Sequence, residues 1–168
     1  MFNQFFTIFN LRALNLDKFS SISSNLETSS TFLLQQDSLF NVKYNKVFDV
    51  YNKKKFIEAL KDALELYDDI KEEGNSEHLF KTTFLIADIY DKTNKHSISL
   101  KYYKNSINFL ESRDNLDNKN YLLNSNYAKT LLRIGSSFQK LKKIDSAKYY
   151  YSRLENLTSL NTEILSFK

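Results

Sequence analysis

The chain has few side chains with the chemistry of an active site. Its only two histidines are His78 and His96, and neither has carboxylates at the spacing of a metal site. Adjacent carboxylates occur at 68–69 and 72–73, where they lie among lysines and are typical of a solvated helix surface. The sequence contains no cysteine, which excludes thiolate metal sites and cysteine nucleophiles. Acid–base and metal chemistry are therefore not expected here.

Phosphate and acyl chemistry lack their usual sequence contexts as well. Gly74 and Gly135 are the only glycines, and two isolated glycines do not make a phosphate-binding loop. No serine stands in the strand–turn–helix context of a nucleophile elbow. We therefore expect a protein that is not an enzyme and needs no metal or cofactor.

The composition favours an all-α fold. Of 168 residues, 42% are hydrophobic and 26% charged, an ordinary globular balance. Proline is absent and glycine is rare, which suits long helices with short connections. The tight glycine turns expected between many short strands are missing.

The N-terminal part differs in composition from the rest. Residues 1–18 are aromatic and apolar but interrupted by polar residues, and they lack the early positive charge of a secretory signal. Residues 19–31 are rich in Ser and Thr, as linkers are. We therefore expect residues 1–35 to be poorly structured or amphipathic, and residues 36–168 to form a domain.

Within that domain, apolar residues recur at intervals of three and four. Asp37 or Ser38 is expected to cap the first helix, and Gly74-Asn75-Ser76 to end the second and cap the third. The expected helices begin at 38 and then span about 54–72, 76–92, 96–112, 120–141 and 144–157, with another starting at 160. They group into units of about 38–73, 76–113 and 120–157, with a further helix over 160–168.

Small and aromatic residues recur at one spacing in these units. Two helices approach closely only where small side chains meet, and aromatic side chains one turn away fill the groove beside the contact. We expect helix-packing roles for Ala59 in the first unit, for Ala87, Tyr90, Ser99 and Tyr103 in the second, and for Gly135, Phe138, Ala147 and Tyr151 in the third.

This pattern resembles the tetratricopeptide repeat, although the family's Trp and Pro are absent and the small residues lie 40 and 48 apart instead of 34. The resemblance implies antiparallel helical hairpins stacked as a short right-handed solenoid. It also implies a non-enzymatic scaffold that binds a protein or peptide in a groove lined by the first helix of each hairpin. The groove positions carried over are Tyr44, Phe48, Lys81, Phe84, Asp88, Asp91, Lys129, Leu132, Arg133, Ser136 and Lys140.

Lys129 and Arg133 lie four residues apart, so both reach one anionic group from one helix face. They match the third-unit half of the clamp with which chaperone-adaptor members of the family hold a peptide carboxylate. Tyr44 and Phe48 replace the first-unit half, so we do not expect that clamp. A mixed aromatic and basic groove is expected instead.

Two other functions remain open. Lysine- and asparagine-rich arrays of this kind resemble the input regions of bacterial histidine kinases and transcription regulators, whose effector part would lie outside this chain. Nucleic-acid binding is a remote alternative: Lys101–Lys104 and Lys148–Tyr151 mix bases with aromatics, but the net charge is only +4.

The compartment stays unknown from the sequence. The missing signal features favour the cytoplasm slightly over export. No run of residues is apolar enough to span a membrane. The last segment is apolar on one side, at Ile164 and Phe167, so we expect the chain to be a piece of a longer protein or to pack its C-terminus on a partner.

Overall fold

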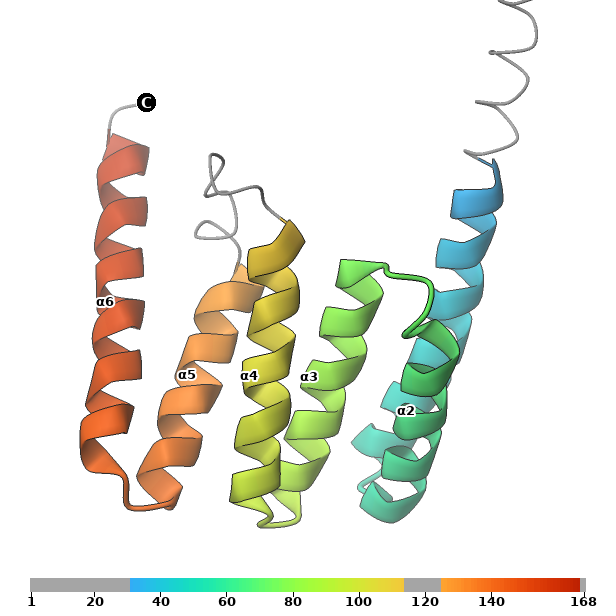
Figure 1. Ribbon diagram of the computed structural model, residues 1–168, viewed down its shortest axis with the longest axis horizontal. Coiled ribbons are helices and arrows are strands. Elements are labelled where there is room, and N and C mark those ends of the chain that lie inside the picture. Colours follow the sequence, from blue (N-terminus) through green and yellow to red (C-terminus); the bar gives the residue numbers. More distant parts are fainter. Residues whose placement is uncertain (1–30, 114–124, 167–168) are drawn as a thin grey trace, which may run out of the picture. The chain divides into compact units, whose positions relative to one another are not determined.

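The computed structural model describes the backbone of residues 31–113 and 125–166 (Figure 1). These residues form six helices and no strand. The first is described over 31–52, and the others are α2 (Phe56–Ile70), α3 (Ser76–Lys92), α4 (His96–Arg113), α5 (Ser125–Lys140) and α6 (Ile144–Ser166). The all-α prediction is confirmed for this part of the chain.

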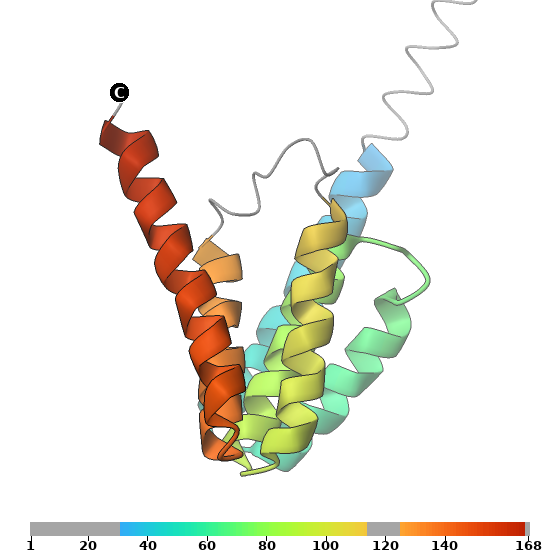
Figure 2. The same cartoon turned by 60° about the vertical axis from the view of Figure 1, so that its left-hand side comes forward.

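The chain divides into two compact units, residues 1–42 and 43–168. In the first unit the described residues, 31–42, are helical throughout. The predicted caps at Asp37 and Ser38 are therefore wrong, because both residues lie inside a helix. In the second unit, α2 to α6 stand side by side in chain order, and each packs mainly on its neighbours in sequence (Figures 1 and 2).

Asn75 begins α3 as predicted. Its side-chain oxygen accepts hydrogen bonds from the backbone N–H groups of Glu77 and His78, at 3.0 and 3.2 Å. Gly74 precedes it at φ +69°, a conformation that glycine adopts without a steric penalty. This pair ends one helix and starts the next within a few residues.

Near the C-terminus, the predicted helix boundaries are wrong. The expected break between helices at 157 and 160 does not exist, since α6 runs without interruption from Ile144 to Ser166. No glycine or proline occurs in this segment, so nothing forces the helix to stop. The expected helical stretch 120–124, the loop 114–119 and the N-terminal residues 1–30 lie outside the described residues.

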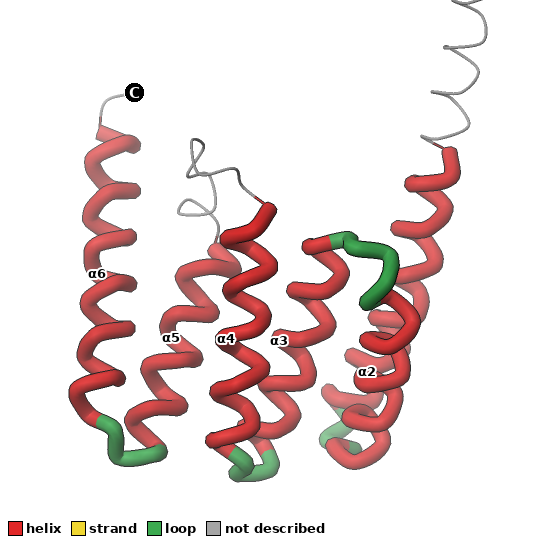
Figure 3. Tube along the Cα trace, in the orientation of Figure 1, coloured by secondary structure: helices red, strands yellow, loops and turns green. Residues whose placement is uncertain are grey.

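Three short turns between helices share one backbone geometry (Figure 3). Their central residues, Lys54, Asn94 and Lys142, have φ of +60°, +60° and +59°. In each turn the residue after the central one donates its N–H to the carbonyl five positions earlier: Lys55 to Val50, Lys95 to Tyr90 and Lys143 to Phe138. This is the hydrogen bond of a Schellman helix end. The central residues are 40 and 48 positions apart, the same steps that separate Ala59, Ser99 and Ala147.

The core of the second unit lies between α3, α4, α5 and α6. Tyr103, Tyr127, Leu131 and Ile134 are fully buried in it. The expected packing residues Ala59, Ala87, Ser99, Tyr103, Gly135, Phe138 and Ala147 are buried, while Tyr90 and Tyr151 are partly exposed. Gly135 faces the ring of Tyr151, one turn beyond Ala147: a Cβ atom at Gly135 would lie 2.5 Å from Cε1 of that ring.

Candidate binding surface

The second half of α3 carries two carboxylates that are nearly enclosed. The side chains of Asp88 and Asp91 are 14% and 12% exposed. A carboxylate this far from water needs charged or hydrogen-bonding partners. The two residues obtain them from different helices.

Asp88 is held by α4 and α5. The hydroxyl of Tyr103 donates a hydrogen bond to its Oδ1, and Nε of Arg133 lies 3.4 Å from the same oxygen. Burial raises the pKa of Tyr103, and the negative charge of Asp88 raises it further. The phenol therefore stays a neutral donor, and Asp88 joins three helices through polar contacts.

Asp91 contacts one lysine and one histidine side chain. Nζ of Lys140, on α5, lies 2.6 and 2.8 Å from its two oxygens, and Nδ1 of His96, at the start of α4, lies 2.9 Å from Oδ1. Burial alone would raise the pKa of Asp91, but the hydrogen bonds from Lys140 and His96 outweigh it and lower the pKa below its usual value. The carboxylate is thus ionised at neutral pH.

Aromatic rings from the first helix lie beside these acids. Tyr44 stacks on Phe48 with a centroid distance of 6.1 Å, and Phe48 stacks on Tyr51 at 5.9 Å. Burial, with a contribution from the charge of Asp88, raises the pKa of Tyr44 to about 12. Burial and then Asp88 also raise the pKa of Tyr51. The charge of Asp88 therefore acts on both phenols.

Near Asp88, α5 presents cations and an apolar side chain. Nζ of Lys129 lies 5.0 Å from the ring centroid of Phe84, a cation–π contact between α5 and α3. Leu132, three positions after Lys129, is 48% exposed. The next residue, Arg133, is partly exposed and contacts Asp88. We call the group Tyr44, Phe48, Asp88, Lys129, Leu132 and Arg133 the Asp88 surface.

Lys81, a residue of the expected groove, contacts its own helix instead of this cluster. Lys81 forms an ion pair with Glu77 at 2.9 Å, near the start of α3. Ser136 is partly buried on α5, and Phe84 is buried and meets the Asp88 surface through its ring. Tyr51 and His96 were not predicted from the sequence to contribute to this surface. Tyr51 lies seven positions after Tyr44 on one helix face, a signal present in the sequence, whereas no local pattern links His96 to Asp91.

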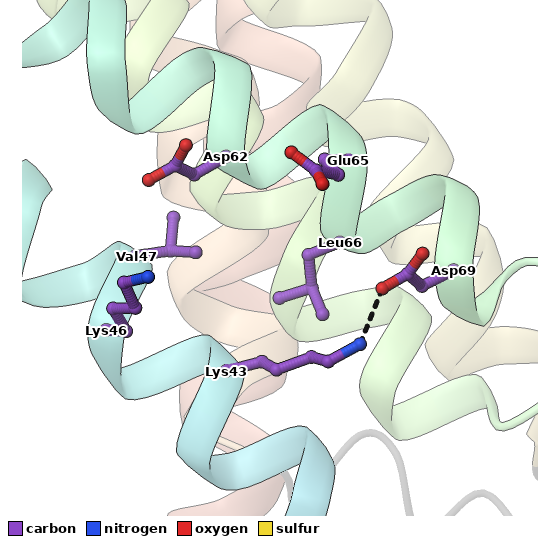
Figure 4. Close-up of a pocket in the computed structure, with 7 residues that line it drawn as sticks. All are labelled: Lys43, Lys46, Val47, Asp62, Glu65, Leu66 and Asp69. Atoms are coloured by element: carbon purple, nitrogen blue, oxygen red, sulfur yellow. Dashed lines mark hydrogen bonds and ion pairs between the residues drawn. The ribbon is translucent and has the colours of Figure 1, made fainter.

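Apart from the Asp88 surface, a hollow lies between the first helix and α2. It has a volume of about 210 Å³, with Val47 and Leu66 at its base. Lys43 and Asp69 form an ion pair at 2.6 Å across it, with both side chains 47% exposed (Figure 4). Exposed pairs of this kind stabilise a fold by at most about 1 kcal/mol. Within the described residues, no three His, Cys, Asp or Glu side chains could jointly hold a metal ion. The hollow therefore offers less specific chemistry than the Asp88 surface.

No family model matches this chain, and a search of curated proteins finds no match. Among the described residues, no helix has the length and apolar character to cross a membrane.

Proposed function

We propose that this chain is a non-enzymatic scaffold of tetratricopeptide-like helical hairpins that binds a peptide or protein segment on the Asp88 surface. The hairpin assignment is supported by the three turns centred on Lys54, Asn94 and Lys142, which repeat the same hydrogen bonds. Each turn precedes a buried small residue by the same five positions, at Ala59, Ser99 and Ala147. A helical hairpin repeated three times, with connecting segments of unequal length, accounts for both the repeated turns and the spacing of the small residues.

The observation that carries the binding proposal is the meeting of aromatic, acidic and basic side chains from three separate helices around Asp88. Phe48 and Leu132 are exposed apolar side chains, whereas Lys129 and Arg133 are accessible cations. Binding sites commonly combine an apolar anchor with a few polar groups that set orientation. The matching ligand has an apolar side chain near an anionic group.

The polar contacts beneath the surface hold it in shape before a ligand arrives. Tyr103 and Arg133 fix Asp88, and the ring stack of Tyr44, Phe48 and Tyr51 limits the rotamers of the aromatic side. A surface that is already ordered loses less entropy when a peptide binds. This favours recognition of a short linear segment.

The test begins with a random peptide library panned on the full-length chain, followed by titration of selected peptides by fluorescence anisotropy. We expect selected peptides to share an acidic and an apolar residue. Lys129→Gln/Arg133→Gln should weaken binding by roughly tenfold or more, since a charge-assisted hydrogen bond contributes about 1.5–3 kcal/mol.

The matched control is Lys101→Gln/Lys148→Gln, which removes two exposed cations from α4 and α6. Both double variants are first compared with the parent protein by thermal melting. If a selected peptide binds the Lys129/Arg133 variant as tightly as the parent, the Asp88 surface is not its binding site.

A further inference from the structure

The three repeated turns lie at the same end of the unit formed by residues 43–168, as two views show (Figures 1 and 2). Each turn places two exposed lysines there: Lys53 and Lys54, Lys92 and Lys95, and Lys142 and Lys143. We call this end, with these six residues, the lysine edge. None of the six forms an ion pair with another described residue, although Lys95 approaches the ring of Tyr90.

Nearby acids do not cancel this charge. Glu58 is paired with Lys55 at 3.1 Å, and Asp91 is paired with Lys140, so both carboxylates are matched by lysines outside the set of six. Asp49 and Asp145 are the acids left near the turns. The lysine edge therefore keeps a net positive charge, concentrated on one end of a chain whose total is only +4.

Each helix that starts at this edge also exposes an isoleucine in its first turn. Ile57 of α2 is 88% exposed, and Ile98 of α4 and Ile144 of α6 are exposed as well. They do not occupy equivalent positions relative to the turns, so the repeat alone does not explain them. Ile57 lines an open hollow together with Lys54 and Phe56. Removing an almost fully exposed isoleucine from water is favourable, because its apolar surface is then buried.

We propose that the lysine edge docks on the surface of an anionic lipid bilayer. Lysines beside exposed aliphatic side chains suit such a surface, because the ammonium groups meet the headgroups while the isoleucines reach the acyl boundary. Three turns at one end of the unit reach a flat surface together. Nucleic acid explains the lysines but not the isoleucines, since its binding sites combine cationic side chains with stacking aromatics and not with exposed aliphatic ones.

This proposal concerns a different face from the Asp88 surface and does not depend on it. The experiment is sedimentation of the full-length chain with phosphatidylcholine vesicles that either contain or lack phosphatidylserine. We expect binding only to the phosphatidylserine vesicles, and we expect it to weaken as salt shortens the Debye length.

Two variants test the lysines and the isoleucines of the lysine edge separately. Lys53→Gln/Lys95→Gln/Lys143→Gln avoids the residues with positive φ and should lower the partition coefficient on the order of a hundredfold, about fivefold for each lysine. Ile57→Ser keeps the charge and should lower it by about tenfold or more through lost apolar burial. The control Lys46→Gln/Lys71→Gln/Lys101→Gln removes the same charge away from the turns and should bind nearly as well as the parent.

Residues 1–30 are present in every variant, so any binding through them is common to all. Equal binding by the two triple variants, or an unchanged partition coefficient for Ile57→Ser, would overturn the proposal. A thymidine oligonucleotide serves as the competing probe. Binding of that oligonucleotide that is lost in the edge variant but kept in Ile57→Ser would assign the edge to nucleic acid instead.

Discussion

Gly135 of α5 lies against the ring of Tyr151 of α6, with no room between them for a methyl group. A Cβ atom at Gly135 would lie 2.5 Å from Cε1 and 2.8 Å from Cδ1 of that ring. The ring is held in turn by a 3.0 Å hydrogen bond from its hydroxyl to Gln139. The glycine therefore sets how closely α5 and α6 approach.

Gly135→Ala should destabilise the protein despite the better helix propensity of alanine. The propensity gain is about 1 kcal/mol, whereas forcing an extra carbon into a packed contact costs about 1–3 kcal/mol. Urea denaturation of both proteins measures the difference. In a Tyr151→Leu background the clash is relieved, and there Gly135→Ala should become neutral or stabilising. A stabilising effect in the wild-type background would contradict the close contact.

Tyr103→Phe should lower the free energy of unfolding by about 1–3 kcal/mol, because it leaves the enclosed carboxylate of Asp88 without its phenol donor. Chemical denaturation measures the loss. Tyr151→Phe is the control, since it removes an equivalent hydroxyl whose hydrogen bond is exposed, and it should change stability by less than about 1 kcal/mol. Equal effects of the two substitutions would show that Asp88 does not depend on Tyr103.

Asp91 should make the protein sensitive to acid. Its pKa is lower in the folded state than in the unfolded chain, so its contribution is complete above the unfolded value and is lost as pH falls through the folded one. The unfolding free energy of the parent should therefore fall between about pH 5 and 2, a decline that Asp91→Asn should reduce. Glu65→Gln, at an exposed position on α2, is the control. If both variants keep the parent's pH slope, Lys140 and His96 do not stabilise the carboxylate.

Ser99 and Ser106 form a matched pair on α4, since both are fully buried. The hydroxyl of Ser106 donates to the carbonyl of Tyr103 at 2.8 Å, whereas that of Ser99 has no hydrogen-bond partner among the described residues. The Ser99→Ala variant should therefore be about 1 kcal/mol more stable than the Ser106→Ala variant. Thermal and urea melts of both variants measure this. The reverse order would mean that Ser99 has a partner, such as a buried water.

Local features of the chain were readable from its sequence. The start of α3 was predicted because Gly74 and Asn75 act through their own backbone angle and side chain, without help from distant residues. The small residues Ala59, Ser99 and Ala147 were recognised because helical periodicity places them on the inward face. The continuity of α6 past residue 157 was missed, because a cluster of polar residues reads like a helix end even though no residue there breaks a helix.

The Asp88 surface was only partly predictable from the sequence. Lys129 and Arg133 were linked by their spacing of four residues, but nothing in the local sequence linked them to Asp88, which was named as a separate position carried over from a resemblance. Lys81 was placed in the same group, but it pairs with Glu77 along its own helix. The position of a residue on a helix face therefore identified candidate surface residues, but it did not show which of them contact each other.

By itself, the sequence determined the all-α class, the start of α3 and many of the inward positions, because helix propensity, capping and periodicity act over a few residues. Only the tertiary structure decided the partners of the buried charges. Tyr103 reaches Asp88 from 15 positions away, and Lys140 reaches Asp91 from 49 positions away. Those contacts depend on how each helix is rotated and shifted against its neighbour, which is set by packing between distant residues such as Gly135 and Tyr151.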